Sequence, residues 1–193
     1  MRPAVLDRGY RRTTRMLFAL VRLFSGRPMP DAAKLTFYRP DYYGSLAKAF
    51  THEAMRGRSA WSVGDRELMA AYVSKVNDCR FCVGAHSATA ARAYQDQARV
   101  TSVLGDLETA PIERPLRETL RMLGTLTQDG RVSTAEMRSV LDTGVSPEQV
   151  LDALAVAFAF NLTDRLASAF DFEVLDKEGF DAGAKYLLKR GYR

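Results

Sequence analysis

The residues of this sequence best suited to chemistry are its two cysteines, in the motif Cys79-Arg80-Phe81-Cys82, and His86 four residues further on. If this stretch is helical, positions 79, 82 and 86 share one face, because residues three and four apart are neighbours on a helix. Helical Cα atoms three residues apart lie roughly 5–5.5 Å from each other, within the range that a disulfide accepts. The two thiols can therefore join and separate with little backbone movement, and His86 lies one turn beyond Cys82, within reach of direct or water-bridged proton exchange.

A helix start at the motif would also favour ionised sulfur. Asn77-Asp78 predicts the end of one helix and the cap of the next. The free N–H groups and the positive dipole end of a first helical turn stabilise thiolate over thiol. This argument favours Cys79, which is nearer the helix start, whereas the spacing to His86 favours Cys82, so the residues alone leave the choice of nucleophile open.

Glu67 is the fourth candidate, on geometric grounds. If the helix ending at Asn77 folds back on the helix starting near Cys79, Glu67 lies roughly 15 Å from the turn along one axis and His86 roughly 12 Å along the other. The two side chains can then face each other, and the carboxylate would hold the imidazole in one tautomer and relay its proton. Alternatively, Glu67 is only an acid in a first turn, favoured by the helix dipole. The spacing leaves both interpretations open.

Three other interpretations of the cysteine motif need to be weighed. A zinc site takes four ligands, which the two cysteines, His86 and Glu67 could just supply, but there is no second cysteine pair and His52 is remote in sequence. We therefore expect no metal, and no cofactor. A thioredoxin-type motif needs a βαβ context, which is lacking here. The third interpretation is a pair of buried structural cysteines with a hydrogen-bonded core histidine, which is less compatible with three reactive side chains on one helix face.

Composition and charge narrow the class of protein. The chain has 193 residues, 47% hydrophobic and 26% charged, which is typical of one folded domain rather than a disordered chain. The net charge of +5 comes entirely from residues 1–28, where seven arginines face one aspartate. The remaining 21 basic and 22 acidic residues nearly cancel, so we expect no nucleic-acid partner. The basic arm could touch an anionic lipid surface or pack on a neighbouring element.

Targeting signals are not evident. The longest apolar stretch, Ala153–Phe160, has eight residues, whereas a membrane span needs about twenty. Met16–Val21 is too short for a signal-peptide core and no small-residue cleavage site follows it. We expect a cytoplasmic protein without a membrane span, in which reducing conditions make a structural disulfide unfavourable.

The periodicity predicts helices almost throughout, and no segment alternates as a strand would. Helix-start signals with a capping residue or proline occur at Ser62 with Asp65, Pro115, Ser133 with Glu136, and Ser146-Pro147-Glu148-Gln149. The last of these should open a long, centrally buried helix to about Phe170, because its middle is apolar nearly all round. Further helices are expected over residues 11–25, 41–55 and 182–189, with prolines 28, 30 and 40 in a less regular segment between the first two. The predicted fold class is all-α, with an antiparallel helix pair that carries the cysteine motif.

These residues resemble the alkylhydroperoxidase D-like, peroxidase-related branch of the carboxymuconolactone decarboxylase superfamily. The resemblance rests on Glu67, eleven intervening residues and then Cys79-x-x-Cys82-x-x-x-His86, on Phe160–Ala167, which is similar to a Phe-Asn-x-x-Asn-Arg-x-Ala segment, and on Gly144–Glu148. It covers about residues 35–175. Two departures stand out: Phe81 occupies a position where alkylhydroperoxidase D can carry a further histidine, and Asp164 replaces the second Asn of the segment.

Charge distribution and resemblance together divide the chain into three expected regions: a basic N-terminal arm (1–28), an alkylhydroperoxidase D-like domain (29–175) and a C-terminal tail (176–193). The resemblance itself implies an all-helical fold. It implies assembly into homo-oligomers (dimers, trimers or hexamers). By the same resemblance Cys82 is the peroxidatic thiol, Cys79 its resolving partner, and Glu67 and His86 the proton relay. The activity implied is reduction of organic hydroperoxides, with an external dithiol or a thioredoxin-like protein as reductant.

Two alternative functions remain. A thiol–disulfide oxidoreductase without peroxidase activity would use the same cysteines and is distinguished by its oxidant. A non-enzymatic helical binding protein would tolerate loss of both cysteines but not of residues 1–28. Lactone decarboxylation is disfavoured, because the decarboxylating relatives are not defined by this cysteine pair.

Overall fold

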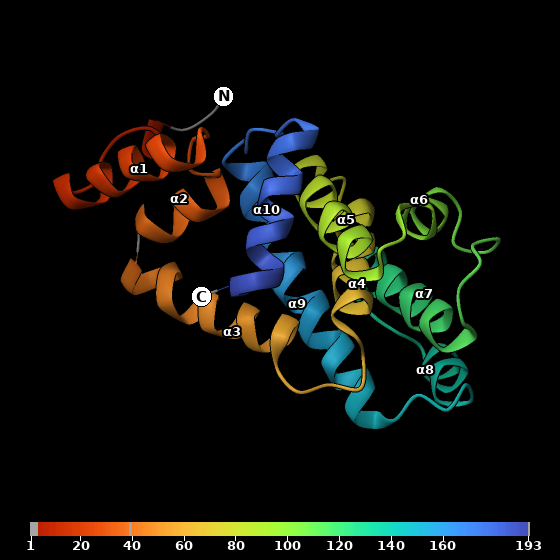
Figure 1. The fold of residues 1–193 in the computed structure, drawn as a ribbon. Coiled ribbons are helices and arrows are strands. Elements are labelled where there is room, and N and C mark those ends of the chain that lie inside the picture. The colour runs from red at the N-terminus through yellow and green to blue at the C-terminus, as the bar shows by residue number, and fades with distance from the viewer. Residues whose placement is uncertain (1–3, 39, 193) are drawn as a thin grey trace.

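The computed structural model describes residues 4–38 and 40–192, and within these ranges every regular element is helical. The all-α fold class expected from the sequence is therefore confirmed. The described elements run in this order (Figure 1): η1 (Ala4–Leu6), α1 (Arg12–Ser25), α2 (Asp31–Tyr38), η2 (Pro40–Gly44), α3 (Ser45–Arg56), α4 (Val63–Val76), α5 (Arg80–Tyr94), α6 (Gln97–Gly105), α7 (Arg114–Asp129), α8 (Thr134–Leu141), α9 (Pro147–Ala169) and α10 (Lys177–Arg190).

The centre of the molecule is the antiparallel pair α4 and α5, with α9 and α7 packed on α4 and α10 on α5. The expected capping residues begin the central helices: Ser62 with Asp65 forms a capping box at α4, and Ser146 with Gln149 forms one at α9. The main hydrophobic core lies between α4, α7 and α9 and includes Leu68, Leu120 and Phe160. These helices fix the positions of the side chains that the sequence singled out.

The turn between α4 and α5 is only three residues long. Asn77 ends α4, Asp78 adopts a left-handed conformation with φ of 54°, and Cys79 is the N-cap of α5. Asp tolerates this conformation better than most residues with a Cβ, because its short polar side chain bonds locally. The tight reversal lays α5 directly along α4, as the sequence predicts.

The structure departs from the sequence-based expectations at three helices. The segment between prolines 28 and 40 was expected to be irregular but forms α2, and α6 lies where no helix was expected. The long helix α9 is not buried all round: Leu151, Phe158 and Leu162 are 66%, 63% and 45% exposed. They lie on one side of α9, opposite Val156, Ala157 and Phe160, which face the core, so α9 has two apolar faces of which the described chain covers one.

The N-terminal helix α1 is exposed, whereas the C-terminal helix α10 packs against α5. The basic helix α1 has no buried residue and exposes Met16, Leu23 and Phe24. In the C-terminal segment, where a helix was expected over residues 182–189, the structure has the longer helix α10. Its Phe180 packs against Gly84 on α5, where a Cβ would lie 2.5 Å from the ring. The C-terminal segment is thus an integral part of the packing around α5. No helix in the described part of the chain combines the length and apolar character needed to span a bilayer.

Candidate active site

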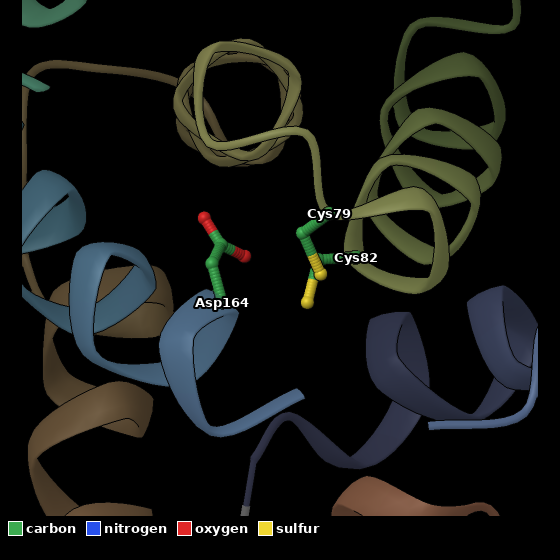
Figure 2. A group of neighbouring side chains, drawn as sticks. All are labelled: Cys79, Cys82 and Asp164. Atoms are coloured by element: carbon green, nitrogen blue, oxygen red, sulfur yellow. The ribbon is translucent and has the colours of Figure 1, made fainter. Parts of the chain in front are cut away.

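The cysteine motif lies at the start of α5, against the end of α9. Cys79 caps the helix and Cys82 lies in its first turn. Both thiols are free and buried, with residue exposures of 4% and 1%. Figure 2 shows the two sulfur atoms side by side at the start of α5, with the carboxylate of Asp164 on α9 facing them. The structure therefore brings the two cysteines together and adds a third acidic group to them.

The two thiols differ in pKa, in opposite directions from the usual value of a cysteine. The hydrogen bond from Cys82 lowers the pKa of the Cys79 thiol by stabilising its thiolate. The same hydrogen bond, then burial and the negative charge of Asp164, raises the pKa of Cys82. Cys79 is therefore the thiol that ionises first, with its thiolate stabilised by the S–H of Cys82, and Cys82 holds its proton tightly.

Asp164 is held in place by neutral donors. Its Oδ1 accepts a hydrogen bond from Ser74 Oγ at 2.9 Å and its Oδ2 accepts one from Asn77 Nδ2 at 2.8 Å. The residue is 1% exposed and has no basic partner among the described residues. We call Cys79, Cys82, Asp164, Ser74 and Asn77 the thiol cluster.

A second polar cluster surrounds Glu67 on α4. Its histidine, His86, lies one turn beyond Cys82 on α5. Glu67 Oε2 accepts a hydrogen bond from His86 Nδ1 at 2.7 Å, and Glu67 Oε1 accepts one from Arg56 Nη2 at 2.6 Å and one from Tyr192 Oη at 2.9 Å. The Glu67 side chain is fully buried, and that of Arg56 is 11% exposed. We call Glu67, His86, Arg56 and Tyr192 the glutamate cluster.

The glutamate cluster contains compensated charge. Burial would raise the pKa of Glu67, but the hydrogen bond and charge of His86 and the charge of Arg56 outweigh it and lower that pKa overall. Burial and then the charge of Glu67 raise the pKa of Tyr192 well above its usual range. Glu67 is therefore a carboxylate that accepts from a neutral phenol, an arginine and the Nδ1–H of His86. Among the described residues no hydrogen bond engages Nε2, which leaves that nitrogen for proton exchange.

The two clusters are adjacent layers between the same helices. Cys82 and His86 are one turn apart on α5, and Asp164 and Phe160 are one turn apart on α9. Phe160 packs edge-on against the His86 ring, with centroids 4.2 Å apart. Glu67 and His86, expected to face each other, do so; no direct hydrogen bond joins His86 to either sulfur in the described residues. A proton passing between the layers would need a bridging water or a change of rotamer.

Apolar side chains cover the thiols. Leu6 from η1, Leu35 from α2, Phe81 and Phe172 belong to the same buried cluster as the cysteines. The rings of Phe81 and Phe172 pack edge to face at 5.4 Å. Beside this cover lies an open hollow of about 460 Å³, bordered by Arg80 and Phe172 among others. Of the aromatic pair, Phe172 borders this hollow.

Five side chains of these clusters were not anticipated as site residues: Arg56 and Tyr192 in the glutamate cluster, and Ser74, Asn77 and Asp164 in the thiol cluster. Arg56 and Tyr192 come from the end of α3 and from the residue after Gly191, far from the motif in sequence. The backbone N–H of Tyr192 donates to His52 Nδ1, and a Cβ on Gly191 would lie 2.5 Å from that imidazole, so α3 fixes the end of the chain. In the sequence Asp164 stands out only as the residue that replaces the second Asn of the Phe160–Ala167 segment, and its closeness to the thiols depends on the fold.

Comparisons with known proteins agree with this fold. The family model "Carboxymuconolactone decarboxylase family" matches residues 42–111, which include both cysteines, Glu67 and His86. The sequence matches no curated protein.

Solved structures resemble the chain over most of its length. An uncharacterized peroxidase-related protein from Silicibacter sp. TM1040 is 22% identical, with a TM-score of 0.75 over 89% of this chain and 90% of that one. An uncharacterized peroxidase-related protein from Ralstonia eutropha JMP134, described as an alkylhydroperoxidase AhpD core, is 20% identical, with a TM-score of 0.72 over 95% of each chain.

A third structure, the debrominase Bmp8 in a cysteine-to-alanine variant bound to 2,3,4-tribromopyrrole, is 13% identical, with a TM-score of 0.69 over 92% of this chain and 90% of that one. These likenesses show that the chain has the alkylhydroperoxidase D-like fold, and its cysteine motif lies in the segment that matches the carboxymuconolactone decarboxylase family model.

Proposed function

We propose that the protein is a thiol-dependent peroxidase that reduces organic hydroperoxides through a dithiol–disulfide cycle of Cys79 and Cys82. The observation that carries this proposal is the pair of free, hydrogen-bonded thiols at the start of α5, one turn from an imidazole with a buried carboxylate behind it. A buried dithiol with one accessible thiolate is suited to attack a weak O–O bond.

The cycle has three steps. A thiolate attacks the terminal oxygen of the hydroperoxide, the O–O bond breaks, and the alkoxide takes a proton to leave as an alcohol. The resulting sulfenic acid condenses with the second thiol, which forms the disulfide and releases water. An external dithiol then reduces the disulfide by exchange and is itself oxidised.

His86 and Glu67 are proposed to serve proton transfer. Glu67 orients the imidazole through Nδ1, and Nε2 accepts the thiol proton or returns it to the alkoxide. We assign the attack to Cys82, the cysteine one turn from His86. The lowered pKa of Cys79 supports the opposite order, so separate variants of the two cysteines are needed.

The decisive assay follows consumption of cumene hydroperoxide by the full chain in the presence of excess dithiothreitol. Catalytic consumption that is lost in the Cys79→Ser, Cys82→Ser double variant supports the proposal. Oxidation of the pair by glutathione disulfide but not by hydroperoxide would instead identify a thiol–disulfide oxidoreductase. A parallel reaction with a brominated pyrrole tests the activity named for the debrominase neighbour, in which the dithiol would replace bromine by hydrogen and release bromide.

We also propose that the chain forms a homo-oligomer through α9 and α3. Leu151, Phe158 and Leu162 form the exposed apolar side of α9, and Phe50 on α3 packs edge-on against Phe158 at 5.2 Å, beside the exposed Leu46. A second copy would bury this surface. Light scattering should show an assembly larger than a monomer that Phe158→Glu reduces; a monomeric wild-type chain would refute this part.

A further inference from the structure

The thiol cluster has the ligand arrangement of a metal site that the sequence did not predict. One ligand atom from each of Cys79, Cys82 and Asp164 lies within 4.8 Å of the other two, and all three residues are buried (Figure 2). In a tetrahedral zinc site, bonds of about 2.3 Å to sulfur and about 2.0–2.2 Å to carboxylate oxygen set ligand atoms roughly 3.5–4 Å apart. Small side-chain rotations therefore suffice to close the three groups around one ion.

The carboxylate in this cluster is oriented as metal-binding carboxylates are. Ser74 and Asn77 donate to its two oxygens, and Asn77 is itself held by Asn161 Oδ1 at 3.1 Å. Hydrogen bonds of this kind fix the direction of a ligand before the ion arrives. Each oxygen retains a lone pair for coordination after accepting one hydrogen bond.

The charge of the cluster also favours a cation. Two thiols and a carboxylate meet in a buried space, and no basic side chain pairs with Asp164 in the described chain. The glutamate cluster one turn away shows the contrast, because there Arg56 pairs with the buried carboxylate at 2.6 Å. A divalent ion would compensate the charge that builds up when the thiols ionise.

We propose that Cys79, Cys82 and Asp164 bind a thiophilic divalent cation of the zinc class. Two thiolates favour zinc or cadmium over magnesium or calcium, which prefer oxygen ligands. Binding displaces the two thiol protons, so a dication and two thiols give a complex with a net charge of −1 and two released protons. Three protein ligands leave the fourth position for water. Because both sulfur lone pairs are then engaged, the bound ion holds the dithiol out of the redox cycle.

This site is tested without any peroxide, so its failure and the failure of the peroxidase proposal are distinguishable. The fully reduced, metal-free chain is titrated with Cd²⁺ while the ultraviolet cadmium–thiolate charge-transfer band is followed, and Zn²⁺ is then added as competitor. The expected result is saturation at one Cd²⁺ per chain, release of about two protons, and loss of the band as Zn²⁺ displaces Cd²⁺. Absence of saturable binding would overturn the proposal.

Variants test the role of the carboxylate. Asp164→Asn keeps the size of the side chain but weakens coordination, and Cd²⁺ affinity should fall at least about tenfold; Asp129→Asn, at an exposed position, should leave it unchanged. Equal affinity of wild type and Asp164→Asn would overturn the three-ligand site. Protection of both cysteines from alkylation by Zn²⁺ in the wild-type chain is a second readout that does not depend on any variant folding.

Discussion

The thiol cluster and the glutamate cluster lie one helical turn apart between α5 and α9, yet they treat buried charge in opposite ways. In the glutamate cluster a carboxylate is neutralised by Arg56 and bonded by His86 and Tyr192. In the thiol cluster Asp164 has only neutral donors and faces two groups that would themselves become negative on ionisation. The first arrangement stabilises the fold and orients an imidazole. In the second, the negative charge of Asp164 opposes the ionisation of both thiols.

This difference in charge compensation indicates which of the two clusters is suited to change its protonation or oxidation state. A buried ion pair with satisfied hydrogen bonds resists change, because removal of either partner leaves an uncompensated charge. Converging acids resist ionising together, because the loss of one proton makes the next harder to remove, and binding of a cation or formation of a disulfide relieves the repulsion. In the proposed cycle the thiol cluster supplies the reacting sulfur atoms, and the glutamate cluster holds the imidazole that exchanges their protons.

The largest effect is expected from the cysteines themselves. Cys82→Ser should abolish hydroperoxide consumption, because it removes the proposed attacking sulfur. Cys79→Ser should still consume one equivalent and stop at a trappable sulfenic acid, since the resolving thiol is gone. Hydroperoxide decay followed in stoichiometric mixtures distinguishes the two variants. Unchanged turnover in Cys82→Ser would refute the assignment, and a reversed pattern would transfer the attack to Cys79.

Loss of charge at Glu67 should damage the fold rather than only the chemistry. Glu67→Gln leaves the guanidinium of Arg56 buried without its carboxylate, and the free energy of unfolding should fall by about 3 kcal/mol. Chemical denaturation of both proteins measures this difference. Asp164→Asn is the matched comparison and should lower the free energy of unfolding by less than about 1 kcal/mol, because its donors are neutral and no cation is stranded. Equal losses would mean that the two clusters do not differ as described.

Acid should destabilise the protein through the same carboxylate. The pKa of Glu67 is lowered in the folded chain relative to its ordinary value of 4.5, so the folded state binds this proton less readily than the unfolded state. The resulting stability is complete well above pH 4.5 and is lost as the pH falls through the folded pKa. Unfolding curves measured between neutral and acidic pH should show this dependence and should show less of it in Glu67→Gln. An identical acid dependence in the variant would assign the effect to other carboxylates.

A smaller effect is expected on thiol ionisation. The charge of Asp164 raises the pKa of both cysteines, so Asp164→Asn should lower the first thiol pKa. The pH dependence of alkylation by iodoacetamide reports this value. Asp129→Asn serves as the control at an exposed site. A profile shifted upward in Asp164→Asn would contradict the electrostatic account of the thiol cluster.

The smallest effect concerns the end of the chain. Tyr192→Phe removes one hydrogen bond to Glu67 and should cost about 1 kcal/mol of stability, because Arg56 and His86 still hold the carboxylate. Thermal unfolding of this variant is compared with Tyr186→Phe, at a residue that is 56% exposed. A loss as large as that of Glu67→Gln would show that Tyr192, rather than Arg56, dominates the cluster.

Much of the fold and part of the site could be predicted from the sequence, for identifiable reasons. Capping boxes at Ser62 and Ser146 and the turn at Asn77-Asp78 are local signals, and they place Glu67 opposite His86 once the helices pair. Helix α2 was missed because prolines at positions 28, 30 and 40 read as breakers, although they flank the helix rather than interrupt it.

The contributions of distant segments could not be predicted in this way. Tyr192 reaches Glu67 only because α10 packs along α5 and His52 on α3 fixes the residue that follows Gly191. No local sequence pattern predicts the contact between Tyr192 and Glu67, because it depends on tertiary packing. Asp164 is noted in the sequence only as a replacement for an Asn, and its distance from the sulfurs follows from the crossing of α9 and the start of α5.

The most direct test of the central claim is peptide mass mapping of the reduced chain after addition of one equivalent of an alkyl hydroperoxide. The account predicts the loss of two hydrogens, confined to the peptide that contains Cys79 and Cys82, and restoration of the original mass by dithiothreitol. An unchanged mass, or oxygen added to the two sulfurs without their joining, would contradict it.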